Sequence, residues 1–102
     1  MSNKMEEKYF WQEDLDDDHI LLGLSHEGQK EVGTVSFIDF YDDIQDVQEG
    51  DPLVSVEGSK AVTELEAPIN GKVIKANLDL ADNPEKINSH DHQDNWIVEL
   101  AK

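Results

Sequence analysis

Short apolar runs separated by turn signals make up the hydrophobic pattern of the chain. The run from Val35 to Phe40 has a period of two, with Val35, Phe37 and Asp39 on one side, which is typical of a strand. The other runs are short, and Gly, Pro, Asn or acidic residues follow them. Together they predict strands at residues 9–11, 20–24, 35–40, 53–56, 62–67, 73–76 and 96–100.

Many short strands at close spacing predict an all-β fold, either a sandwich or a barrel. Only His26–Glu31 and Pro84–Ile87 are expected to be helical. Residues 1–7 (Met1 to Glu7) form a polar stretch that predicts a flexible N-terminal tail, so the domain is expected to span residues 8–102.

The charge of the chain restricts its partners. Formal net charge is −16, from 24 acidic residues against 8 basic ones, and every basic residue is lysine. This composition argues against binding nucleic acid or an anionic membrane surface, because both need clusters of Lys or Arg. The sequence also lacks cysteine, an apolar signal segment and a run long enough to span a bilayer. We therefore expect a cytoplasmic protein.

One of the few cations lies at a predicted turn, in the sequence Val56-Glu57-Gly58-Ser59-Lys60-Ala61. Gly58 and Ser59 resemble a two-residue hairpin turn, with Gly58 expected to supply a positive φ. Lys60 takes either a corner of the turn or the first strand position after it. In both cases its ammonium projects into water, and an ordinary surface lysine is the alternative to a functional one.

Several short motifs follow one another in the order and spacing of a known family. They are Gly23-Leu24-Ser25 with Gln29 and Gly33, Gly50-Asp51, Glu57-Gly58-Ser59-Lys60-Ala61, Ala67-Pro68 with Gly71-Lys72-Val73, Asn83-Pro84-Glu85 with Asn88, and Trp96. With these motifs the chain resembles the lipoyl-carrier family, and within it the H proteins of the glycine cleavage system. Biotin carriers share the fold, but methionines usually flank their attachment lysine, whereas Ser59 and Ala61 flank Lys60.

The resemblance implies a flattened β-barrel of two interlocking sheets, the lipoyl/biotinyl-carrier barrel-sandwich hybrid. It implies that lipoate is amide-linked to Lys60 and swings between enzymes, while the protein itself is a carrier and not a catalyst. Recognition of the modified lysine is expected to use the residues around it, namely Glu57, Gly58, Ser59, Ala61 and Glu64.

The resemblance also implies partners. A lipoate ligase or lipoyltransferase attaches the group, and in glycine cleavage the arm visits a pyridoxal-phosphate glycine decarboxylase, an aminomethyltransferase and dihydrolipoyl dehydrogenase. A monomer is expected of such a shuttle.

Four departures from the family pattern argue against a role in glycine cleavage. Phe10 replaces a family glutamate that is associated with holding the amine of the loaded arm. Phe10 could offer that amine a cation–π contact in place of a carboxylate. The second acid of the family site remains as Glu64. Gly58-Ser59 replaces Ser-Val, the loop at residues 91–96 lacks the family's Pro and Tyr, and the sequence stops at Lys102 without a C-terminal helix. The hypothesis is a carrier that serves glycine cleavage poorly.

Two alternatives to glycine cleavage remain. Some short H-like proteins relay lipoate, or accompany sirtuin and macrodomain proteins in lipoate-dependent ADP-ribosylation. The other alternative is a protein–protein adaptor of the same fold with Lys60 unmodified. An independent enzyme ranks last, because no constellation of residues here would do chemistry unaided.

Other polar clusters have a simpler interpretation than a binding site. His90-Asp91-His92, with Asp94 nearby, is read as a solvated loop rather than a metal site. Asp16-Asp17-Asp18, and Asp42-Asp43 with Asp46, lack the spacing of a calcium loop. His19 and His26 have no Ser or Cys at a spacing that would suggest a catalytic pair. Trp11 and Trp96 are interpreted as packing residues. No metal is expected.

Overall fold

Two antiparallel sheets form most of the molecule in this computed structural model, which describes residues 9–41 and 45–102. The predicted tail at residues 1–7 and the acidic pair Asp42-Asp43 lie outside the described residues. The proposed domain boundary therefore stays a prediction. The chain has a radius of gyration of 12.3 Å, with extents of 34 × 31 × 25 Å.

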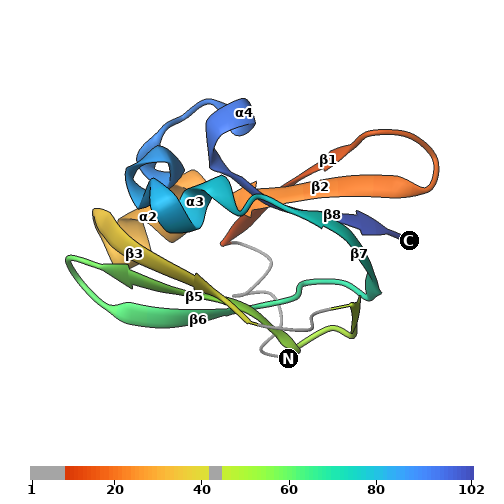
Figure 1. The fold of residues 1–102 in the computed structure, drawn as a ribbon, viewed down its shortest axis with the longest axis horizontal. Helices are drawn as coiled ribbons and strands as arrows, with labels where there is room; N and C mark the ends of the chain where they lie inside the picture. The colour runs from red at the N-terminus through yellow and green to blue at the C-terminus, as the bar shows by residue number, and fades with distance from the viewer. Residues whose placement is uncertain (1–8, 42–44) are drawn as a thin grey trace.

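The larger sheet has five strands in the order β1-β2-β8-β7-β4. They are β1 (Phe10–Asp14), β2 (His19–Leu24), β8 (Trp96–Ala101), β7 (Gly71–Ala76) and β4 (Asp46–Val47). The smaller sheet has three strands in the order β3-β5-β6, which are β3 (Val35–Phe40), β5 (Pro52–Gly58) and β6 (Val62–Glu66). Figure 1 shows the smaller sheet facing the larger one across the interior.

The core lies between the sheets. Leu22, Leu24, Ile97 and Leu100 come from the larger sheet and are fully buried, as are residues of β5 and β6 in the smaller sheet. Burial does not alternate strictly, since neighbours such as Ile97 and Val98 are both buried, and the apolar burial holds the two sheets together. The predicted all-β fold of two sheets is confirmed. Within the described residues no strand pairing joins one sheet to the other, so side-chain packing connects them.

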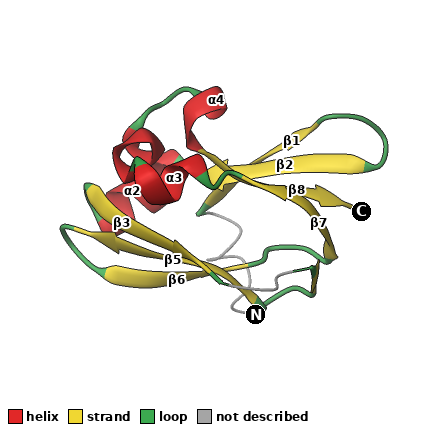
Figure 2. Cartoon of the chain, in the orientation of Figure 1, coloured by secondary structure: helices red, strands yellow, loops and turns green. Residues whose placement is uncertain are grey.

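Four short helical segments gather at one end, beside the ends of β3 and β5 (Figure 2). Two of them, α2 (His26–Val32) and the 3₁₀ helix η1 (Pro84–Asn88), confirm the helices predicted from the sequence. The other two, α3 (Asp79–Asp82) and α4 (His92–Asn95), were not predicted. Each is a single turn, which is too short to show a helical period.

Strand β3 exists where the sequence predicts it, but its faces do not alternate strictly. Val35 lies opposite Gly58 and Phe37 lies opposite Glu57, so Ser36 is an extra residue that forms a β-bulge. The bulge changes which side chains face inward: Val35 and Ile38 are buried, and Phe37 is 54% exposed. The expectation that Val35 and Phe37 share a face was therefore wrong.

No helix among the described residues is both long and apolar enough to cross a membrane. The cytoplasmic location stays a prediction from the sequence.

Candidate functional site

Lys60 is a corner residue of the turn that joins β5 to β6. Strand pairing ends with Glu57 opposite Val62, and the Gly58 amide donates a hydrogen bond to the Ala61 carbonyl over 2.9 Å. Ser59 and Lys60 are therefore the two residues of the turn, and both are exposed. Figure 1 shows this tip at the left end of the molecule. The structure thus decides between the two positions that the sequence left open.

Backbone hydrogen bonds hold the tip against the connection between α2 and β3. The Lys60 amide donates to the Val32 carbonyl, and the Ser59 amide donates to the Thr34 carbonyl, both over 2.9 Å. The Ser59 hydroxyl in turn accepts from the Thr34 amide over 3.1 Å. A two-residue turn with only its own strands behind it would be mobile, whereas this one is fixed to a second element on one side.

Two glycines allow this close approach. A Cβ added at Gly58 would lie 2.0 Å from the carbonyl oxygen of Val32, and one at Gly33 would lie 2.3 Å from the Ser59 hydroxyl. Gly33 also has a φ of 81°, a conformation that other residues rarely adopt. Gly58 is not among the glycines with positive φ. The prediction that it supplies a positive φ to the turn was wrong: Gly58 is the last residue of β5, where a neighbouring backbone leaves no room for a side chain.

The Lys60 ammonium makes its hydrogen bond to a neutral group. Its Nζ donates to the carbonyl oxygen of Lys30, in the last turn of α2, over 3.1 Å. Helix C-terminal carbonyls lack partners within the helix and favour a positive charge. No carboxylate among the described residues forms an ion pair with Lys60. One hydrogen bond to the Lys30 carbonyl thus orients the Lys60 amine, which is otherwise exposed to solvent.

The residues expected to take part in recognition lie on the hairpin itself. Glu57 and Ala61 flank the turn and are exposed, and Ser59 is occupied with Thr34. Glu64 is further along β6, opposite Ser55, where its carboxylate accepts a hydrogen bond of 2.6 Å from the Tyr41 hydroxyl. That carboxylate raises the pKa of Tyr41, because it stabilises the protonated phenol. The part of these residues in recognition stays a prediction.

Phe10 and Glu64 do not form one exposed site. Phe10 is 5% exposed and belongs to the core, where it pairs with Leu24. Its ring therefore offers little face to a cation at the surface, and the cation–π contact considered for it is not supported. Glu64 lies on the exposed side of β6, bonded to Tyr41.

A groove of about 330 Å³ that the sequence did not reveal opens beside the turn. It is lined by His26, Gln29, Lys30, Gly33, Thr34, Asn88 and His90. A smaller cavity of about 160 Å³ shares His26, Gln29 and His90 with it and continues towards Trp11. The described lining of both includes no carboxylate.

Two motif residues of the groove have structural roles. The Gln29 side-chain amide donates to the carbonyls of Ile87 and Ser89, over 3.1 and 3.2 Å. The Asn88 side chain accepts from the Val35 amide over 3.0 Å. These contacts join η1 to α2 and to β3. The spacing of the motif was visible in the sequence, but its tertiary partners were not.

The His90-Asp91-His92 stretch does not converge on a common point. The Asp91 side chain caps α4 by accepting from the Gln93 amide, and His92 stacks on Trp11 with ring centroids 3.6 Å apart. The Trp11 indole donates to the side-chain oxygen of Asn95 over 3.0 Å, so this tryptophan is a half-buried packing residue. No group of three or more His, Cys, Asp or Glu that could hold a metal occurs among the described residues.

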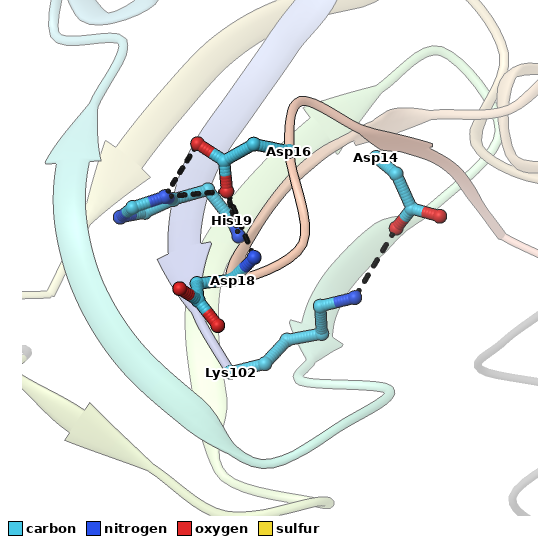
Figure 3. Close-up of polar contacts among 5 residues, drawn as sticks. All are labelled: Asp14, Asp16, Asp18, His19 and Lys102. Atoms are coloured by element: carbon cyan, nitrogen blue, oxygen red, sulfur yellow. Dashed lines mark hydrogen bonds and ion pairs between the residues drawn. The ribbon is translucent and has the colours of Figure 1, made fainter.

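The acidic turn between β1 and β2 lies at the other end of the molecule from Lys60 and is an internally bonded structure (Figures 1 and 3). The Asp16 carboxylate accepts from the amides of Asp18 and His19 over 2.8 Å and contacts Nδ1 of His19 at 2.9 Å. The hydrogen bonds from Asp18 and then from His19 lower the pKa of Asp16, and the Asp16 carboxylate raises that of His19. The carboxylate of Asp16 is thus occupied by its own turn.

A model of the family described as "Glycine cleavage H-protein" matches residues 3–102. The chain belongs to this family. It is 40% identical over 90 residues to the probable glycine cleavage system H protein of Thermococcus kodakarensis, with 88% of this chain and 66% of that protein covered. It is 32% identical over 97 residues to the glycine cleavage system H protein of Vibrio atlanticus, with 95% and 77% covered. The chain thus spans just under two thirds of the length of the archaeal relative.

The fold is also that of a solved relative. The crystal structure of a glycine cleavage system H protein from Mycobacterium marinum matches with a TM-score of 0.76 and 19% identity, over 98% of this chain and 79% of that one. The family resemblance inferred from the motifs is confirmed. H proteins are carrier components and not catalysts.

Proposed function

We propose that the chain is a lipoyl carrier in which lipoate is amide-linked to Nζ of Lys60. The observation that carries this proposal is the placement of Lys60: an exposed amine at the corner of a two-residue turn, on a backbone held by Val32 of α2 and Thr34 of the connection to β3. An attaching enzyme must reach the amine and hold the backbone below it. Membership of the H-protein family supports the same assignment.

Attachment requires the Lys60 amine to be neutral, because an ammonium has no lone pair. The amine loses a proton, forms a new N–C bond to the acyl carbon of lipoate activated by ATP, and loses a second proton as AMP leaves. The resulting amide keeps one N–H, which is enough to retain the hydrogen bond to the Lys30 carbonyl. When bound, lipoate supplies a dithiolane whose S–S bond opens and closes as it accepts and releases electrons or a carried group.

The partners follow from this role. An enzyme that attaches lipoate is required, and dihydrolipoyl dehydrogenase is the expected oxidant of the reduced arm. In glycine cleavage the further partners are glycine decarboxylase and the aminomethyltransferase. We propose that the carrier acts in the cytoplasm and as a monomer.

A second observation favours a carrier that does not protect an aminomethyl group. Position 10 holds a buried phenylalanine, and the described lining of the groove beside Lys60 offers no carboxylate to a bound ammonium. We therefore expect low activity in an assay with purified glycine decarboxylase and aminomethyltransferase. Full activity with this carrier would reject that expectation and leave the lipoyl assignment intact. Low activity favours the other lipoate-dependent pathways, including lipoate relay and ADP-ribosylation.

The direct test is intact mass with peptide mapping after incubation with ATP, lipoate and the lipoate-attaching enzyme of the same organism. The wild type should gain one lipoyl group, on the peptide that contains Lys60. Lys60→Ala should gain none, whereas Lys30→Arg, a change to the neighbouring exposed lysine, should gain one. If neither a ligase nor a transferase of that organism modifies Lys60, the proposal fails and the unmodified adaptor becomes the better interpretation.

A further inference from the structure

The smaller sheet exposes two large apolar side chains next to the Lys60 turn. Phe37 on β3 is 54% exposed and Val62 on β6 is 71% exposed. Both lie opposite Glu57 of the central strand, so Phe37, Glu57 and Val62 form one row across the three strands. Neighbouring strands are about 4.8 Å apart, which puts the two apolar residues roughly 10 Å apart with the carboxylate between them. Single exposed apolar residues are common, whereas these two share one row of the sheet beside the exposed Lys60 turn.

The row exists because β3 is irregular. The bulge at Ser36 shifts the register between Val35 and Phe37, and the phenyl ring moves from the core side to the outer side of the sheet. Bulges re-aim side chains at functional positions more often than elsewhere. A large apolar side chain that a local irregularity turns towards water is stabilised by a partner that covers it, and the described residues leave Phe37 half exposed.

The rest of this face is acidic. The strands β3, β5 and β6 contain Asp39, Glu57, Glu64 and Glu66 and no lysine or arginine. Asp39 and Glu57 form no ion pair with another described residue. Acylation removes the charge of Lys60 itself, so the modified hairpin becomes more negative still.

We propose that this face docks the enzyme that attaches lipoate to Lys60, and that this enzyme presents an apolar recess flanked by lysine or arginine. We call the surface made by Phe37, Glu57, Val62, Asp39 and Glu64 the hairpin face. The inference rests on the proposed function of Lys60 and adds the surface and the chemistry of its partner. Apolar contact supplies affinity, and the opposite charges guide the encounter and fix its orientation.

The attaching enzyme is the partner that this surface fits best. It must act on Nζ, only one lysine side chain away from the backbone, so its own surface must cover the turn and the strands next to it. Enzymes that act on the dithiolane meet the far end of a longer arm and can work without contacting β3. The row at Phe37 and Val62 is the first row below the turn that carries large exposed side chains.

The test measures the initial rate of lipoylation against carrier concentration for matched variants. Phe37→Ser/Val62→Ser removes both apolar side chains, and Leu15→Ser is the control, since Leu15 is 47% exposed in the turn between β1 and β2. We expect kcat/KM to fall about tenfold for the double variant through KM, with kcat retained at saturating carrier. The control should match the wild type. Circular dichroism and the thermal midpoint establish that each variant is folded.

The electrostatic part has its own readout. Glu57→Lys should lower kcat/KM about tenfold at low salt, and the difference from wild type should shrink as NaCl is raised. Lys60 remains available in every variant, so saturating enzyme should still modify each one fully. If wild type is modified but the double variant and Glu57→Lys keep wild-type kcat/KM, the hairpin face is rejected while the lipoyl assignment stands. If the wild type is not modified, the proposed function fails first.

Discussion

Gly58 shows how one residue without a side chain determines the position of Lys60, the proposed attachment site. It is the last residue of β5, and the space where its Cβ would lie is filled by the Val32 backbone. The close approach lets the next residues, Ser59 and Lys60, bond to the backbone of Thr34 and Val32, just after and at the end of α2. A side chain at position 58 would push the two segments apart and break those bonds.

We therefore expect Gly58→Ala to lower the free energy of unfolding by about 3 kcal/mol, as overpacking against rigid backbone does. Urea denaturation measures this. Ala61→Ser, at the exposed position across the turn, is the control and should change stability by less than about 0.5 kcal/mol. A cost for Gly58→Ala as small as that of the control would show that the hairpin can move away from α2 freely.

Asp16 and His19 give a second prediction at this scale, one of pH dependence. The carboxylate raises the pKa of His19 above its ordinary value of 6.5, and the bonds from Asp18 and His19 lower the pKa of Asp16 below 3.8. The contribution of His19 is thus complete below pH 6.5 and is lost as pH rises through its raised pKa. The contribution of Asp16 is complete above pH 3.8 and is lost as pH falls through its lowered pKa.

In an NMR titration, Asp16→Asn should lower the pKa of His19, since the amide keeps the shape of the side chain and removes its charge. Asp17→Asn changes the same turn at a residue that does not contact His19, and it should leave that titration unchanged. Equal titration of His19 in wild type and Asp16→Asn would contradict the contact.

The candidate site was partly predictable from the sequence. The exposure of Lys60 was predicted because a glycine-containing turn between two apolar strands exposes its corner residues whatever the tertiary structure is, whereas lipoate attachment at Lys60 stays a prediction from the family motifs. The role of Gly58 was not found, since its constraint comes from Val32, 26 positions away along the chain. The carbonyls of Lys30 and Val32 that receive Lys60 belong to the backbone, and a backbone acceptor leaves no mark in the sequence.

At the scale of elements, helix α2 supports the hairpin. Its C-terminal end supplies the carbonyls of Lys30 and Val32, and its N-terminal end is capped by Ser25, whose hydroxyl accepts from the Gly28 amide over 3.0 Å. A seven-residue helix is not stable by itself, so the cap and the tertiary contacts keep it formed.

Ser25→Ala should therefore lower the free energy of unfolding by about 1 kcal/mol. Ser25→Thr keeps a hydroxyl at the same position and should cost only a few tenths of that. The midpoints of urea unfolding compare the three proteins. If alanine and threonine cost the same, the hydroxyl does not cap α2.

The positions of the strands along the chain were predicted better than which of their side chains are buried. Every predicted strand is present, because short apolar runs between turn residues carry a strong signal. The bulge in β3 was missed, since Val35 to Phe40 reads as a regular alternation and only the partner strand shows that Ser36 is extra. The single-turn helices α3 and α4 were missed for lack of a period. The groove beside Lys60 was missed because its lining comes from α2, the connection to β3 and residues 88–90, which are far apart in the sequence.

The whole molecule carries a net charge of −16 on 102 residues, and its described ion pairs lie at the surface. Exposed pairs contribute little to stability, whereas the sum of like charges destabilises the compact state. Salt screens charges beyond the Debye length, which is about 30 Å at 10 mM, comparable to the extents of the molecule, and about 3 Å at 1 M.

Raising NaCl from 10 to 500 mM should therefore stabilise the folded protein by about 1 kcal/mol, which corresponds to a rise of about 4–8 °C in Tm for a chain of this size. Differential scanning calorimetry measures the midpoint. Choline chloride at equal ionic strength should give the same rise, which separates screening from binding of sodium. A Tm that stays constant or falls would mean that repulsion does not limit stability.

If lipoate is attached to Lys60 as we propose, the fixed position of the turn also determines how enzymes meet the carried group. The acylated side chain is then a tether with a fixed base, because two backbone bonds hold the turn to Val32 of α2 and to Thr34 of the connection to β3. All the freedom of the arm then lies in its own rotatable bonds, and its end explores one small volume above the tip. An enzyme docked on the carrier meets that end at an effective concentration on the order of millimolar, however dilute the carrier is. Loosening the turn would enlarge the volume and lower the local concentration, so rigidity below the lysine promotes rapid delivery above it.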